Sequence, residues 1–139
     1  MQQLLNATFP FILALFHIVG PTPADLGVNS GHLSPCTSDA HCASATWAVD
    51  DANASLNQLK AVIEQTSGTQ ILEEKPAYLH ATYSSRIFGF IDDLELYIVD
   101  NETLEARSVS RLGESDLGVN RQRLNTLETN LRNKSDGHL

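Results

Sequence analysis

The basic residues of this chain are concentrated in one place. Four of the six arginines lie within a short stretch, at Arg107, Arg111, Arg121 and Arg123, although the chain carries a net charge of −8. Guanidinium groups bind carboxylates and phosphates through paired hydrogen bonds. The stretch therefore indicates a site for a small anion. If carboxylates lie beside the same arginines, they form ion pairs with them instead, and little charge is left for a ligand.

Alternation along the chain shows which acidic residues face these arginines. In the strand expected at 88–99, Leu94 and Leu96 point to one side, whereas Asp93 and Glu95 point to the other. A pairing register shifted by one residue would bury charge among leucines. Burial therefore selects the register that places apolar side chains on one face and charged side chains on the other. Asp93 and Glu95 are therefore expected to face the arginines of the next strand.

The strand expected at 104–110 and the helix that follows complete this cluster. Arg107 and Arg111 share one face of the strand, and Ser115 or Asp116 can cap the helix, whose N-terminus favours anions. We expect one contiguous patch. Its candidate ligand-binding residues are Arg107, Arg111, Asp116, Asn120, Arg121, Asp93 and Glu95.

Asp92 is the exception to this alternation, because it points to the apolar side of its strand. An unpaired charge is costly there, so we expect a backbone donor or a partner such as Arg121 or Asn120. Adjacent residues of a strand face opposite sides, so Asp92 and Asp93 are not a simple acid–base pair.

The hydrophobic pattern predicts an α+β domain. A helix is expected at 51–65, capped by Asp51, and the irregular, Gly- and Ser-rich stretch 21–50 precedes it. Strands are expected at 69–74, 78–85, 88–99 and 104–110. The closing helix carries the stripe Leu117, Leu124, Leu127 and Leu131. The fold class is an antiparallel sheet of about four strands flanked by an N-terminal and a C-terminal helix.

The N-terminal segment is apolar from Ala7 to Gly20. It is shorter than the ~20 residues of a spanning helix but suits a secretory signal, with small residues before Asp25. We expect residues 1–24 to be a signal peptide or membrane anchor and residues 25–139 to be one domain. An uncleaved tether or a buried first helix is the alternative.

Cys36 and Cys42 are the only cysteines. In an oxidising compartment they are expected to form a disulfide. A zinc site with His32 and His41 is the competing interpretation, but adjacent ligands at 41 and 42 are awkward to direct at one ion. The pattern favours the disulfide, and no metal or cofactor is predicted.

Catalytic patterns are weak. His80 lies on an expected strand, with Ser84, Ser108 and Ser110 as available hydroxyls and several carboxylates for a third member, but no nucleophile-elbow motif is present. We predict no catalytic residue. The acidic charge also argues against nucleic acid as a partner.

Several segments together resemble a known family. They are Leu33–Cys36, Cys42–Ser44, Phe88–Glu95 and Arg107–Arg121. Their order and residues resemble those of the domain-of-unknown-function family numbered 1499. The resemblance covers roughly residues 26 to 132, with His41 where an Asn is usual. It implies a fold and an exported setting, in a periplasm or thylakoid lumen, but no reaction.

These observations favour a non-enzymatic binding or accessory domain with an unknown protein partner and a possible membrane tether through its N-terminal segment. The alternative is an enzyme or carrier that acts on a small anion through the Arg107–Arg121 cluster.

Overall fold

The computed structural model describes residues 20–85, 89–113 and 115–135. The segment expected to be a signal or anchor lies almost wholly outside these residues, as does Phe88. Neither helix of the described chain is long and apolar enough to cross a membrane.

An antiparallel five-stranded sheet forms the centre of the domain, in the order β3-β7-β6-β5-β4. The strands are β3 (Cys42–Ala48), β4 (Thr69–Lys75), β5 (Tyr78–Ser84), β6 (Ile91–Asp100) and β7 (Thr103–Ser110). The α+β class is confirmed, and the four predicted strands are present. The fifth strand, β3, was missed because its sequence is dominated by Ala, Ser and Thr and resembles a loop.

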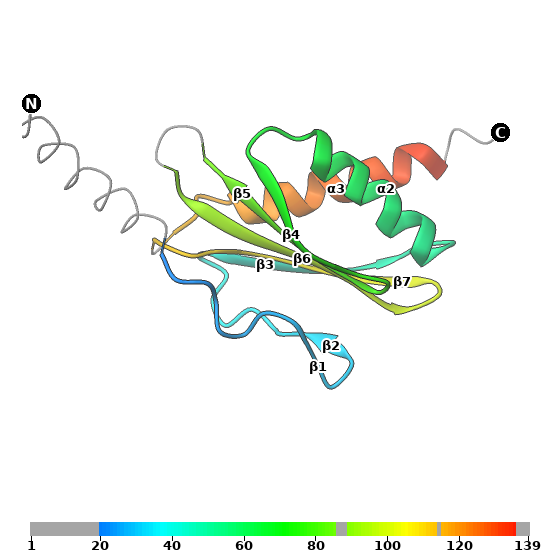
Figure 1. Ribbon diagram of the computed structural model, residues 1–139, viewed down its shortest axis with the longest axis horizontal. Helices are drawn as coiled ribbons and strands as arrows, with labels where there is room; N and C mark the ends of the chain where they lie inside the picture. Colours follow the sequence, from blue (N-terminus) through cyan, green and yellow to red (C-terminus); the bar gives the residue numbers. More distant parts are fainter. Residues whose placement is uncertain (1–19, 86–88, 114, 136–139) are drawn as a thin grey trace, which may run out of the picture.

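Two helices cover one face of the sheet (Figure 1). They are α2 (Ala52–Gln65) and α3 (Val119–Ser135). As predicted, Asp51 caps α2, since its side chain accepts a hydrogen bond from the backbone N–H of Ala54. Between helices and sheet lies the hydrophobic core, which includes Leu56, Leu59, Ile63, Leu94, Leu96, Leu104, Leu124, Leu127 and Leu131.

The start of α3 differs from the prediction. Leu117 was expected in the apolar stripe, but it precedes the helix, is 92% exposed and has a φ of 55°. The Asp116 carboxylate accepts a hydrogen bond from the Gly118 N–H, and the first helical turn closes from Gly118 to Gln122. This local capping begins the helix after Gly118 and turns Leu117 outward.

The second face of the sheet is covered by residues 25–41, which we call the covering segment. It contains the short strands β1 (Val28–Asn29) and β2 (His32–Leu33), which pair with each other as a separate two-stranded sheet. Figure 1 shows it on the side of the sheet opposite the helices. The Cys36–Cys42 disulfide joins its C-terminal end to the first residue of β3.

Candidate functional site

Glu95 is one centre of the polar face beneath the covering segment. The strand register sets it directly opposite Arg107, and its carboxylate accepts hydrogen bonds from Arg107 Nη1 at 3.3 Å and the Tyr78 hydroxyl at 2.8 Å. The backbone N–H of Gly27 also donates to it, at 2.6 Å. Arg107 Nη2 in turn binds Asp25 at 2.7 Å. The pair Glu95–Arg107 therefore holds the covering segment at two points.

Asp93 is the second centre. Arg111 donates to both of its carboxylate oxygens, from Nε at 2.8 Å and from Nη2 at 3.0 Å. His80 Nε2 lies 2.7 Å from Asp93 Oδ1. Because an ionised carboxylate can only accept, His80 carries its proton on Nε2 in this contact.

These ionic groups are removed from water. The Asp93 and Glu95 side chains are fully buried, and those of Arg107 and Arg111 nearly so. Burial alone would raise the pKa of Asp93, but hydrogen bonds from His80 and Arg111 outweigh it and hold that pKa below its ordinary value. Burial also raises the pKa of Tyr78, and its bond to Glu95 raises it further. The Tyr78 hydroxyl therefore keeps its proton and donates a hydrogen bond to Glu95. The arginine–carboxylate ion pairs considered for this face are present, and they are buried.

A separate polar network lies on the helix face of the sheet. Asn120 is fully buried at its centre. Its Nδ2 donates to Asp116 at 2.7 Å and to the Ser110 hydroxyl at 2.8 Å, and its Oδ1 accepts from the Ser108 hydroxyl at 2.7 Å. Hydrogen bonds from Asn120 and from the Gly118 backbone outweigh the effect of burial and lower the pKa of Asp116. This network anchors the start of α3 to the end of β7.

Asp92 reaches the same network through a partner that was not predicted. Arg123 Nη2 binds it at 2.9 Å, and the Arg123 guanidinium also stacks 4.2 Å from the centre of the Tyr83 ring. Arg121 instead donates to the backbone carbonyl of Ser44 in the edge strand β3. The expectation that Asp92 finds a partner is confirmed, but that partner is Arg123 rather than Arg121 or Asn120.

The single patch expected around Arg107, Arg111 and Arg121 is also wrong. Alternation along β7 points Arg107 and Arg111 to the face opposite the helices, whereas α3 packs on the other face. Asp93, Glu95, Arg107 and Arg111 form one network, and Asp116 and Asn120 belong to the other. Arg121 belongs to neither.

Tyr78 and His80 belong to the network of Asp93 and Glu95, and they were missed although the sequence held a signal for them. Tyr78 and His80 alternate with Leu79 and Ala81, so strand parity alone places them beside the carboxylates of β6. Asp25 gave no such signal, because it is 82 positions from Arg107 in sequence and lies in irregular structure.

The predicted disulfide between Cys36 and Cys42 is confirmed. Both sulfurs are therefore unavailable as thiolate ligands for zinc. His32 is bound to Glu105 of β7, whose second oxygen accepts the Leu33 N–H at 2.9 Å. The cysteine loop and these contacts give the covering segment two further attachments to the sheet.

The serines considered as nucleophiles do not lie beside His80. Ser108 and Ser110 face α3 and bind Asn120, and Ser84 is four strand positions away, roughly 13 Å. The His80–Asp93 pair thus has the geometry of an oriented imidazole, but these three hydroxyls are not within its reach.

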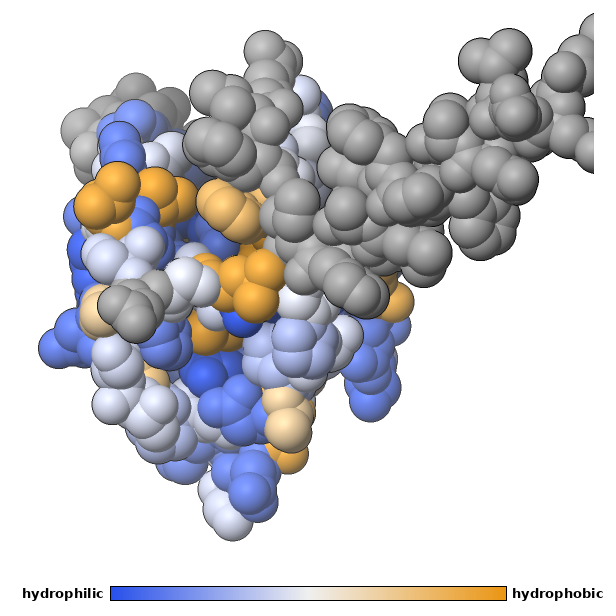
Figure 2. All heavy atoms as spheres, turned by 90° about the vertical axis from the view of Figure 1, so that its left-hand side faces the viewer, coloured by the Kyte–Doolittle hydropathy of each residue, from blue (hydrophilic) through white to orange (hydrophobic). Residues whose placement is uncertain are grey.

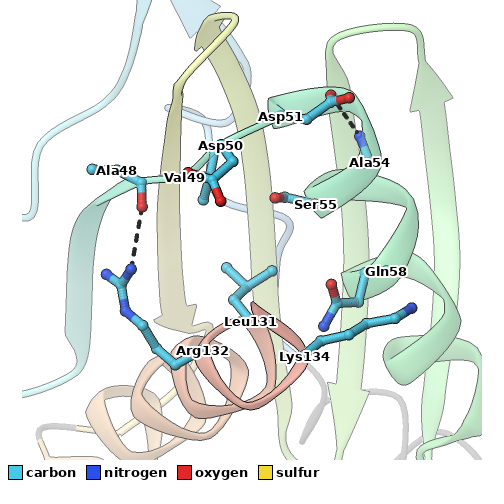
Figure 3. Close-up of a pocket in the computed structure, with 10 residues that line it drawn as sticks. All are labelled: Ala48, Val49, Asp50, Asp51, Ala54, Ser55, Gln58, Leu131, Arg132 and Lys134. Atoms are coloured by element: carbon cyan, nitrogen blue, oxygen red, sulfur yellow. Dashed lines mark hydrogen bonds between the residues drawn. The ribbon is translucent and has the colours of Figure 1, made fainter. Parts of the chain in front are cut away.

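A groove of about 610 Å³ opens between the N-terminus of α2 and the C-terminal part of α3. Figure 3 shows Leu131 at its centre, Arg132 donating to the Ala48 carbonyl at 3.3 Å, and Asp51 bound to Ala54. Two cationic side chains and two carboxylates line it, so its charges balance. This lining selects no particular class of ligand.

Comparison with known proteins gives one match. A family model described as "Protein of unknown function (DUF1499)" matches residues 27–131. Searches of curated proteins and of solved structures give no match. The matched range includes the covering segment from residue 27 onward and both polar networks except Asp25.

Proposed function

This chain belongs to the DUF1499 family of proteins of unknown function, and we propose that it is a non-enzymatic binding or accessory domain of an exported compartment. The observation that supports this proposal best concerns the network of Asp93, Glu95, Arg107 and Arg111. Its arginines and carboxylates hold the covering segment against the sheet, so we expect a partner to bind on surfaces outside this network.

The contacts between the covering segment and the sheet indicate that the network keeps this face of the sheet covered. Asp25, Gly27 and Leu33 each bind a side chain of the sheet, and the disulfide fixes the other end of the segment. Charged hydrogen bonds formed away from water are stronger than exposed ones. The network therefore stabilises a closed face.

The same contacts weaken the alternative of a small-anion carrier. Arg111 already binds both oxygens of Asp93, and Arg107 is shared between Glu95 and Asp25. Arg107 Nε is buried without a hydrogen-bond partner among the described residues. A single N–H binds an anion more weakly than the paired donors with which arginine usually binds one.

Thermal unfolding with added anions distinguishes the accessory domain from the small-anion carrier. A ligand at 100 times its Kd would stabilise the fold by ~2.7 kcal/mol. We expect phosphate and small carboxylates to raise the melting temperature no more than chloride at equal ionic strength. A saturable rise with phosphate or a carboxylate, absent with chloride, would instead establish the anion-binding function.

Fractionation of the native host tests the exported setting. We expect an oxidised Cys36–Cys42 pair and either a mature N-terminus near Asp25 or retention in a membrane fraction, read by mass spectrometry. A soluble cytosolic protein that begins at Met1 and contains free thiols would refute it.

A further inference from the structure

Leu117 is exposed in a backbone conformation that leucine rarely adopts. Its φ of 55° lies in the left-handed region, where the side chain crowds the backbone. The loop nevertheless holds it there, through hydrogen bonds from the Gly118 N–H to the Asp116 carboxylate and from the Leu117 N–H to the Ser115 hydroxyl. Such strain is retained where the surrounding structure enforces it and is concentrated at binding sites.

Other exposed apolar residues lie at the same end of the domain. Phe90 precedes β6, Leu112 follows β7, and Val119 begins α3; all three are more than a third exposed. The start of β6 and the end of β7 are adjacent, since the Arg111 N–H binds the Ile91 carbonyl. Figure 2 looks onto this end and shows hydrophobic surface gathered there. We call these residues (Phe90, Leu112, Leu117 and Val119) the apolar end.

Gly20, the first described residue, lies at this end of the domain. A Cβ at Gly20 would stand 2.7 Å from Leu112 Cγ, so the two residues are in direct contact. In the sequence, Gly20 is the last residue of the apolar N-terminal segment. The apolar run from Ala7 to Gly20 is shorter than the ~20 residues that span a bilayer. No polar linker separates it from Leu112, so lipid bound by the run would lie within reach of the apolar end.

We infer that the apolar end docks on a lipid surface, with Leu117 inserted among the lipids. This inference rests on the proposed function and names its binding partner. The surface consists of protruding side chains, which suits the fluid boundary of a bilayer. The net charge of −8 favours uncharged or zwitterionic lipid, because anionic headgroups would repel the domain.

Tryptophan scanning on vesicles tests the inference with the full chain. The only native tryptophan, Trp47, is buried in the core and serves as a constant background. Leu117→Trp reports on the apolar end, and Leu72→Trp, at a half-exposed leucine on the edge strand β4, is the matched control. Each variant is mixed with phosphatidylcholine vesicles with or without brominated acyl chains, and thermal melting verifies its fold.

We expect Leu117→Trp emission to shift to shorter wavelength on vesicles and to be quenched by brominated lipid, while Leu72→Trp emission does neither. Adding phosphatidylglycerol should reduce the shift. The inference is overturned if the chain does not float with vesicles, if it floats without quenching at position 117, or if both positions are quenched equally. A concentration-dependent shift without vesicles would identify a second copy of the chain as the partner and also overturn it. The fractionation result and the quenching result are read separately: failure of quenching at position 117 leaves the exported setting intact, and a cytosolic protein with free thiols refutes the exported setting whatever the quenching shows.

Discussion

Removing Arg111 should leave the buried Asp93 carboxylate without its cationic partner. In Arg111→Ala, the fully buried Asp93 carboxylate loses the two hydrogen bonds at 2.8 and 3.0 Å and keeps His80 as its described side-chain partner. Each bond to a charged group contributes ~1.5–3 kcal/mol, and loss of one partner of a buried pair costs ~3–5 kcal/mol. We expect that loss in the free energy of unfolding, or a melting temperature lower by about 12–20 °C for a domain of this size.

The pH dependence gives the prediction a second readout. In the native protein the pKa of Asp93 is lowered, so its stabilisation is present above the unfolded pKa of ~3.9 and is lost as the pH falls through the folded pKa. Without Arg111, burial favours the protonated acid. The stability difference between variant and native protein should therefore shrink between pH 7 and pH 3.

Urea unfolding followed by circular dichroism measures both effects. Arg121→Ala is the matched control, because this exposed arginine donates to one backbone carbonyl, and its loss should be below ~1 kcal/mol. Asp93→Asn in the Arg111→Ala background should recover part of the stability, since the stranded charge is gone. Equal losses in Arg111→Ala and Arg121→Ala at pH 7 would refute the argument from burial.

Three further predictions concern other parts of the fold. Thiol titration of the denatured protein should find no free thiol before reduction and two afterwards, and reduction of the Cys36–Cys42 loop should cost about 2 kcal/mol; a free thiol before reduction would contradict the pairing. Asn120→Ala should lower stability by ~2–3 kcal/mol because it leaves buried partners unsatisfied, whereas Asn125→Ala, on the exposed side of α3, should change it by less than ~0.5 kcal/mol; similar values would contradict the network. Leu117→Asn should raise stability by ~1 kcal/mol by relieving the left-handed strain, and a lower melting temperature would show that Leu117 packs in the free domain.

The arrangement of the domain explains how an acidic protein buries so many charges. One face of the sheet is covered by α2 and α3 through apolar packing. The other face is covered by a segment with few large apolar residues, so its attachment depends on ion pairs, backbone N–H donors and the disulfide. Edge strand β3 is covered in a third way, by hydrogen bonds from Arg121 and Arg132 of α3 to its outward carbonyls, which limits pairing with other chains.

Local patterns in the sequence were sufficient for most of the secondary structure. The helix capped by Asp51 and the strands β4 to β7 follow from apolar periodicity and turn residues, which act over a few positions. The opposition of Glu95 and Arg107 also follows, because a strand alternates its side chains and burial selects one register.

Tertiary structure decided what lies over each face and which charges meet. Strand β3 is stabilised mainly by its partner β7 and by α3, and a sequence rich in Ala, Ser and Thr carries no local sign of that pairing. Asp25 and Gly27 reach the sheet across long sequence separations, so their contacts depend on the complete fold. The same holds for the separation of Arg121 from Arg111, because the packing of α3 on one face of the sheet places their side chains apart.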